Sequence, residues 1–164
     1  MREGCHYIAG LAERTPIRLR KRSASAIIPS SQQPREVLAH TGTHDNDTPL
    51  GWWNRTPGTD STRTSAEIAA ERDSAGQYLC AEGRDMNWIF IRTVMVSAAD
   101  TVLIALQDML GLSSEARMNL PRRPDGNWQW RMPPGSPSPE HERRLRHLAR
   151  IYDRWKAPPC RNRD

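Results

Sequence analysis

Apolar and polar residues alternate in blocks along the chain, and these blocks predict an order of strands and helices. A short apolar block followed by small residues favours a strand over residues 36–43. Apolar side chains at helical spacing predict amphipathic helices over residues 65–79 and 85–98. The continuous apolar run 101–106 is typical of a parallel strand buried on both faces.

Capping residues and loop signals refine this order. Ser65 is a plausible N-cap for the first helix, and Gly83 lies beyond its end. Turn-rich segments are expected at 54–64 and 113–134, and a short helical turn at 107–112. A charged helix, 139–155, is expected to close the chain. Its predicted inward face consists of Leu145, Leu148, Ile151, Tyr152 and Trp155.

The resulting strand–helix–strand–helix order predicts an α/β fold with two parallel strands and a right-handed crossover. Two parallel strands do not complete a sheet, because their outer edges remain unpaired. We therefore expect a piece of a larger structure. Such a piece should expose the apolar faces of residues 102–106 and of the helix 85–98.

Charge separates the first 34 residues from the rest of the chain. The 164 residues carry a formal charge of +5, and basic residues crowd the segment 14–22 before a stretch rich in Ser and Pro. A basic, irregular and disordered arm over residues 1–34 is one interpretation. A nucleic-acid contact through clustered Arg is a second. A third is translation from a wrong reading frame, which overlaps the first.

Composition also excludes several classes of protein. The chain is too short for a complete (β/α)8 barrel, which needs about 200–250 residues. Its longest apolar stretch, 88–112, is interrupted by charged residues, so no membrane span is expected. Three widely separated cysteines form neither a disulfide framework nor a zinc motif. These features, with no signal-peptide pattern, predict a cytoplasmic protein.

The densest polar cluster, Thr-Gly-Thr-His-Asp-Asn-Asp-Thr at 41–48, follows the first predicted strand. In α/β folds, polar groups at the carboxyl end of a strand face the active-site mouth. An active-site role, an Asx-rich turn and a metal site are all compatible with these residue types. The pattern does not fit an EF-hand loop, because Pro49 and Leu50 occupy positions that require a ligand and a glycine.

Two long motifs resemble those of the 4-α-glucanotransferases, also called amylomaltases or disproportionating enzymes. The first is TGTHDNDT at 41–48 followed by GWW at 51–53. The second runs over 105–131 and contains ALQDMLGL, SEARMNLP, GNW and WR in that order. The resemblance covers residues 35–156, with a tail at 157–164. It implies the C-terminal part of a TIM barrel, with its seventh and eighth strands and their helices.

The resemblance also implies a chemistry and a set of residues. The family uses a retaining double displacement on α-1,4-glucans and maltooligosaccharides, with an Asp nucleophile, a Glu acid/base and a third carboxylate. Asp45 matches that third carboxylate, which stabilises the transition state. His44 matches a hydroxyl-binding His, and Asn119 is implied on the acceptor side. Neither a metal nor an organic cofactor is implied.

The nucleophile and acid/base motifs have no counterpart in this sequence, which predicts a C-terminal fragment that is inactive alone. Alternatives are a non-catalytic piece that complements a separate N-terminal part of the barrel, and a nucleic-acid-binding protein with a basic arm. His40 and Arg122 depart from the family pattern. For four tryptophans, packing is favoured over sugar contact: Trp52, Trp53, Trp128 and Trp130.

Overall fold

The computed structural model describes residues 18–20, 38–57, 63–81, 83–121 and 123–155. The predictions for the rest of the basic arm, for Arg122 and for the tail at 157–164 lie outside these residues.

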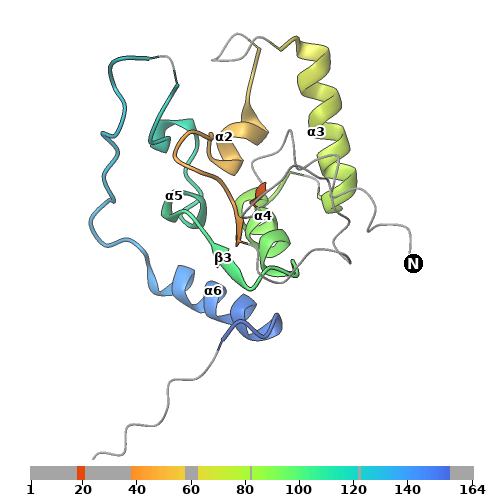
Figure 1. The fold of residues 1–164 in the computed structure, drawn as a ribbon, viewed down its shortest axis with the longest axis vertical. Coiled ribbons are helices and arrows are strands. Elements are labelled where there is room, and N and C mark those ends of the chain that lie inside the picture. The colour runs from red at the N-terminus through yellow and green to blue at the C-terminus, as the bar shows by residue number, and fades with distance from the viewer. Residues whose placement is uncertain (1–17, 21–37, 58–62, 82, 122, 156–164) are drawn as a thin grey trace, which may run out of the picture.

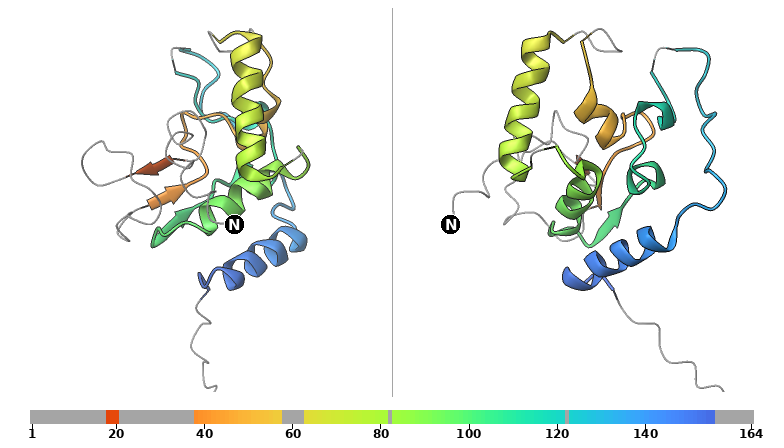
Figure 2. Two further views of the ribbon diagram at one scale, coloured as in Figure 1. Left: turned by 90° about the vertical axis from the view of Figure 1, so that its right-hand side faces the viewer. Right: turned by 180° about the vertical axis from the view of Figure 1, so that it is seen from behind.

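Three short strands form one sheet in the order β1-β2-β3, and the left view of Figure 2 shows them side by side. β2 (Leu38–His40) and β3 (Thr101–Leu103) are parallel, with His40 opposite Leu103, so the predicted parallel pair is confirmed. β1 (Arg18–Arg20) pairs antiparallel with β2. The sequence predicts no strand there, because only backbone pairing and no apolar pattern defines β1.

The prediction that residues 101–106 are buried on both faces is wrong. The strand ends at Leu103. Within it, Thr101 and Leu103 are exposed and Val102 is half-buried. β3 is the last strand of the sheet that the described residues form, so nothing in that sheet pairs with its outer edge. The exposed Leu103, at 54% of its full surface, agrees with the expected apolar edge.

The described part of the crossover from β2 to β3 contains three helices, two of which are predicted from the sequence. α2 (Pro49–Asn54) was missed, although Thr48 caps it by accepting a hydrogen bond from the Gly51 amide at 3.0 Å. α3 (Ser65–Leu79) has the predicted bounds, but its N-cap is Thr64 rather than Ser65. The Thr64 hydroxyl and the Glu67 side chain form a capping box, which satisfies two amide groups at once.

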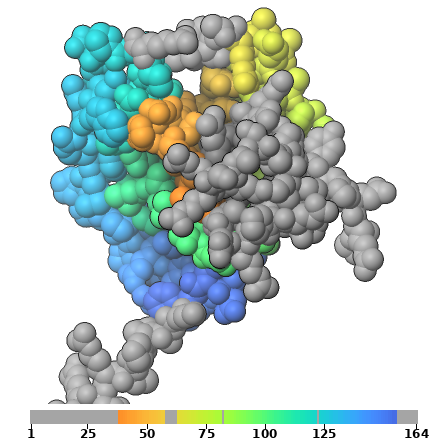
Figure 3. Space-filling model, viewed as in Figure 1, coloured from red at the N-terminus to blue at the C-terminus, as the bar shows by residue number. Residues whose placement is uncertain are grey.

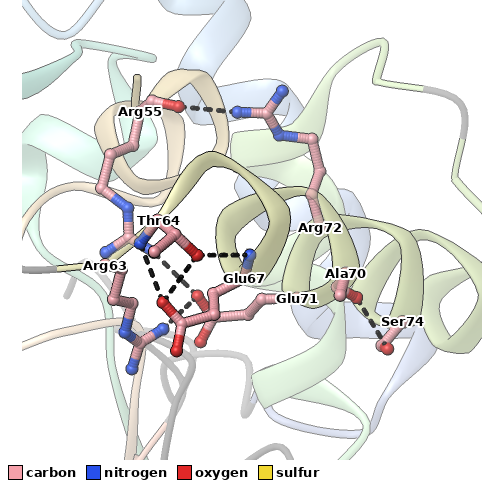
Figure 4. Close-up of polar contacts among 8 residues, drawn as sticks. All are labelled: Arg55, Arg63, Thr64, Glu67, Ala70, Glu71, Arg72 and Ser74. Atoms are coloured by element: carbon pink, nitrogen blue, oxygen red, sulfur yellow. Dashed lines mark hydrogen bonds and ion pairs between the residues drawn. The ribbon is translucent and has the colours of Figure 1, made fainter. Parts of the chain in front are cut away.

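Charged side chains tie α3 to the end of α2, as Figure 4 shows. Glu71 on α3 accepts a hydrogen bond from Arg55 at 2.7 Å and another from Arg63. Arg72, one residue further along α3, donates to the backbone carbonyl of Arg55 at 2.8 Å. The Glu71 side chain is 8% exposed, so these contacts compensate a largely buried carboxylate. They fix the helix that follows the polar cluster.

The core is centred on α4 (Met86–Met95), which lies behind the strands in Figure 1. Met86 and Phe90 pack against Trp52 of α2 and Ala75 of α3. The opposite side of α4, with Trp88, Ile91 and Met95, packs against Met109 and the last helix. The expectation that this helix exposes its apolar face is therefore wrong, since helices on both sides of it cover it.

The last part of the chain follows β3 and contains helical segments. α5 (Leu106–Met109) follows β3, the 3-10 helix η3 (Ser114–Ala116) follows α5, and α6 (Pro139–Ile151) closes the fold. Of the predicted inward face of α6, Leu145, Leu148 and Tyr152 pack on the core, whereas Ile151 and Trp155 are exposed. None of the helices in the described part is long and apolar enough to cross a bilayer.

Candidate active site at the carboxyl end of the parallel strands

The chain segments that leave β2 and β3 are joined by hydrogen bonds at the carboxyl end of the sheet. The Thr41 amide donates to the carbonyl of Leu103 at 3.2 Å. The Thr41 hydroxyl accepts from the amide of Ala105 at 3.3 Å and donates to the carboxylate of Asp108 on α5. The polar residues after β2 are therefore held beside the start of α5. Their proximity follows from the parallel pairing, because the carboxyl ends of parallel strands lie at the same edge of a sheet.

Asp108 is a buried carboxylate beneath this end of the sheet. It is 3% exposed, and burial raises its pKa from 3.8 to about 6. The hydrogen bond from Thr41 opposes this rise, and the nearby charge of Asp47 adds to it. Asn87 on α4 donates to the backbone carbonyl of Asp108 at 3.1 Å. These contacts connect the core helix to the base of the site.

The polar cluster itself is a tight turn stabilised by its own side chains. Asn46 accepts hydrogen bonds from the amide and hydroxyl of Thr43 at 3.0 and 2.8 Å. Asp47 accepts from the amide of Thr48 at 2.9 Å and from the hydroxyl of Ser114 at 2.8 Å. The Asx-rich turn is thus present, and the side chains of His44 and Asp45 take no part in these bonds.

Those two side chains, His44 and Asp45, meet Asn119 from the loop after η3. The Nδ2 atom of Asn119 donates to Oδ1 of Asp45 at 2.5 Å, and Nε2 of His44 lies 3.3 Å from the same oxygen. The amide of Asn119 donates to the carbonyl of His44 at 3.0 Å. The structure therefore brings together the three residues that the motifs singled out, although Asn119 lies far from the other two in sequence.

Arg117 completes this contact and was not singled out from the sequence. Its Nη2 donates to the backbone carbonyl of Asp45 at 2.7 Å, and its Nε donates to that of Asn119 at 2.9 Å. A guanidinium group suits this position because it presents several donors in a fixed plane. The only signal in the sequence was the motif SEARMNLP, in which Arg117 precedes Asn119 by two positions.

A small cavity of about 90 Å³ lies between the turn after β2 and the residues after β3. It is smaller than the roughly 300–1,000 Å³ of ligand pockets in proteins, so by itself it is too small to enclose a ligand of that class. Figure 3 shows the two segments, orange and teal, next to each other on one face. The lining residues are Gly42, Thr43, His44, Asn46, Asp47, Thr48, Ala105, Gln107, Asp108, Ala116, Arg117 and Met118.

The tryptophans of the motifs differ in their surroundings. Trp52 is buried in the core, where its ring meets Phe90 edge-on, so the packing interpretation is confirmed for it. Trp53 and Trp130 are half-buried. Trp128 is 51% exposed, and its ring lies 5.1 Å from that of His44. Packing in the core does not account for Trp128.

Within the described ranges, no three His, Cys, Asp or Glu side chains lie close enough together to hold a metal ion. The acidic residues of the turn are instead bonded to neighbouring amide, hydroxyl and side-chain groups. Their arrangement is that of hydrogen-bond acceptors at a partly open surface.

Comparisons with known proteins agree with one another. The family model described as "4-alpha-glucanotransferase" matches residues 15–137, a range that begins inside the expected arm. A 4-alpha-glucanotransferase of Thermus thermophilus is 42% identical over 124 residues, which are 72% of this chain and 23% of that protein. A chloroplastic/amyloplastic 4-alpha-glucanotransferase of Oryza sativa is 38% identical, over 73% of this chain and 19% of its own length.

The structural comparison points the same way. An amylomaltase from Streptococcus agalactiae, solved in complex with acarbose, matches with a TM-score of 0.64 and 26% sequence identity. The match covers 77% of this chain and 24% of that one. The chain therefore spans about a quarter or less of the length of the relatives that it matches.

Proposed function

Because this chain belongs to the 4-alpha-glucanotransferase family, we propose that it supplies part of an active site that transfers α-1,4-glucan segments between maltooligosaccharides. The observation that carries the proposal is the meeting of His44, Asp45 and Asn119 at the carboxyl end of the parallel strands. This is the end at which α/β enzymes hold their substrates.

The geometry of Asp45 supports a role in stabilising the transition state. Within the described residues, the side-chain contacts of Asp45 fall on Oδ1, and about half of the side chain (49%) is exposed. One oxygen is thus held in place while the other is open to a ligand. In our proposal, Asp45 accepts hydrogen bonds from the 2- and 3-hydroxyls of one glucose ring. Such bonds strengthen as the ring flattens toward the oxocarbenium ion.

His44 and Asn119 are proposed as substrate-binding residues beside this carboxylate. The His44 side chain is 55% exposed and is proposed to donate a hydrogen bond from a ring N–H to the same sugar hydroxyls. The backbone and side chain of Asn119 both bond to the turn. In our proposal, Asn119 lines the acceptor side of the cleft. None of these roles requires a metal or an organic cofactor.

We further propose that residues 35–156 are the C-terminal part of a (β/α)8 barrel, with β2 and β3 as its seventh and eighth strands. The parallel pairing of β2 with β3 and the exposed outer edge of β3 support this assignment. The natural partner of that edge is the N-terminal part of the barrel.

The three separated cysteines fit a reducing compartment, which supports a cytoplasmic location.

Catalysis by this chain alone is not expected. A retaining mechanism needs a nucleophile and an acid/base whose carboxyl groups lie about 5–5.5 Å apart. Asp45 supplies neither a covalent bond nor a proton transfer in our proposal, so it does not replace them. We expect the chain to bind maltooligosaccharides and to restore transfer when an upstream barrel part is added.

Calorimetric titration of the purified chain with maltoheptaose tests the binding, with Asp45→Asn as the variant and Asp125→Asn, in an exposed turn, as its control. We expect Asp45→Asn to weaken binding by at least about tenfold, the loss of one charged hydrogen bond. The control should bind as the unmodified chain does. Absence of maltoheptaose binding, or equal binding by Asp45→Asn, contradicts the proposal.

Glucose release from maltotriose tests the catalytic part of the proposal. We expect none from the chain alone, and release when the separately expressed upstream region of the Thermus thermophilus relative is present. Release by the chain alone, abolished by Asp45→Asn, would show that other acids of this sequence complete the site.

A further inference from the structure

Trp128 combines two properties that a structural tryptophan does not need. Its side chain is 51% exposed, although its large ring would gain free energy by burial. Its ring centre lies 5.1 Å from that of His44, with 38° between the planes. The exposed ring therefore borders the open side of the His44–Asp45 pair rather than the core.

Hydrogen bonds hold the backbone that carries this exposed ring. Trp128 has a φ of +64°, in the left-handed region that bulky residues rarely adopt. Its amide donates to the carbonyl of Met118 at 2.7 Å, and its carbonyl accepts from Nη1 of Arg131 at 2.8 Å. The preceding Asn127 accepts from the amide of Leu120 at 2.8 Å. A backbone conformation that is unfavourable by itself is thus maintained by hydrogen bonds on both sides.

These observations distinguish Trp128 from Trp155, the other strongly exposed tryptophan of the described chain. Trp155 is 41% exposed and lies after α6, where Arg146 covers its ring at 5.7 Å. Its surroundings contain none of the residues of the candidate active site. Trp128, in contrast, lies against His44 on the face where a glucan bound to Asp45 would lie.

We infer that Trp128 is a stacking platform for a second glucose ring of the bound α-glucan, next to the ring held by Asp45. This inference rests on the proposed function and extends it by naming what recognises the neighbouring ring. The C–H face of a glucose ring packs on a flat aromatic face, while its hydroxyls stay free for polar contacts. A platform on a backbone held by hydrogen bonds loses less conformational entropy when the sugar binds than one on a mobile loop would, which favours tight binding.

The platform makes binding depend on ligand length. Maltose and maltoheptaose both fill the position at Asp45. Maltose then places a ring on Trp128 in only one of its two registers, whereas maltoheptaose does so in all of its registers but one. Trp128→Ala removes the platform, Trp128→Phe retains a smaller aromatic face, and Trp155→Ala is the matched control. Calorimetric titration gives the affinities, and the thermal transition of each variant shows whether it has folded.

We expect Trp128→Ala to weaken maltoheptaose binding by about tenfold, the scale of one lost stacking contact, with a smaller loss for Trp128→Phe. Trp155→Ala should bind as the unmodified chain does. Maltoheptaose binding that Trp128→Ala leaves unchanged overturns the platform and leaves the proposed function intact. No binding by the unmodified chain overturns both.

A measurement on the unmodified chain keeps the inference testable if Trp128→Ala does not fold. The indole N–H signal of Trp128, assigned in a nitrogen–proton correlation spectrum with the Trp128→Phe variant, is followed during a maltoheptaose titration. We expect this signal to shift with the same midpoint as the calorimetric binding curve, while the Trp155 signal stays in place. A Trp128 signal that does not move at saturating maltoheptaose overturns the inference.

Discussion

The hydroxyl of Thr41, at the end of β2, donates a hydrogen bond to the buried carboxylate of Asp108 on α5. The same hydroxyl accepts from the amide of Ala105, the residue before α5. One side chain thus joins the exits of both parallel strands below the His44–Asp45 turn. The free energy of this contact depends on the charge of Asp108, because a buried carboxylate is costly to ionise.

This dependence predicts a pH effect on stability. Asp108 has a pKa of about 6 in the folded chain, against 3.8 ordinarily, so the folded state binds its proton more tightly. Its stabilising contribution is full below about pH 4, falls as the pH rises to about 6, and amounts to about 3 kcal/mol in total. Asp108→Asn should flatten this slope and be more stable than the unmodified chain at pH 7.

Urea unfolding between pH 4 and pH 8 measures the effect, with Asp100→Asn, an exposed residue, as the control. The control should retain the slope of the unmodified chain. Parallel pH profiles for the unmodified chain and Asp108→Asn would show that Asp108 does not titrate in this range.

A second prediction concerns Arg117, which bonds to the carbonyls of Asp45 and Asn119. Arg117→Lys keeps the charge, but a single ammonium group does not reproduce the planar pair of donors. We expect the side-chain amide signals of Asn119 to shift in the nitrogen–proton spectrum, and maltoheptaose binding to weaken by about tenfold. Arg92→Lys is the control, because Arg92 bonds to Tyr152 between α4 and α6. Unchanged Asn119 signals in Arg117→Lys would contradict the positioning role.

A third prediction concerns Arg154, which fixes α6 to the end of α4. Its guanidinium group donates to the carbonyls of Met95, Ser97 and Ala99 at 2.7, 2.6 and 2.8 Å. Arg154→Ala leaves these carbonyls at the helix end without their donor and should lower the free energy of unfolding by about 1–3 kcal/mol. Thermal unfolding measures the loss. The exposed Arg150→Ala should change it by less than about 0.5 kcal/mol, and equal losses in the two variants would refute the prediction.

A fourth prediction uses Gly51, at which α2 passes close to the site. A Cβ atom at this position would overlap Oδ1 of Asp47 and lie 2.5 Å from the hydroxyl oxygen of Ser114. Alanine favours a helix by about 1 kcal/mol over glycine, but separating these side chains breaks their hydrogen bond. We expect Gly51→Ala to destabilise the chain by about 1–3 kcal/mol in urea unfolding. Gly42→Ala, whose Cβ would meet its nearest atom at 3.6 Å, is the control.

Local sequence patterns predicted the helices that are stabilised mainly by interactions within their own segment. The helix Ser65–Leu79 has its predicted bounds because helix-favouring residues and apolar spacing agree there, although its N-cap is Thr64 and not the predicted Ser65. α2 was missed because its six residues include a proline, a glycine and two tryptophans, and Thr48 as N-cap together with burial determines it. The burial of α4 was also missed, since covering it requires helices distant in sequence.

The sequence by itself determined the family and the parallel strand pair, and it nominated His44, Asp45 and Asn119 as candidate site residues, because long motifs and strand-ending polar residues are local features. Only the tertiary structure decided how these residues meet: Asn119 and Arg117 contact the turn across more than 70 positions of sequence. It also decided that Trp52 is buried whereas Trp128 is exposed beside His44. Residue type does not specify such differences, since burial and hydrogen-bond partners depend on segments that only folding brings together.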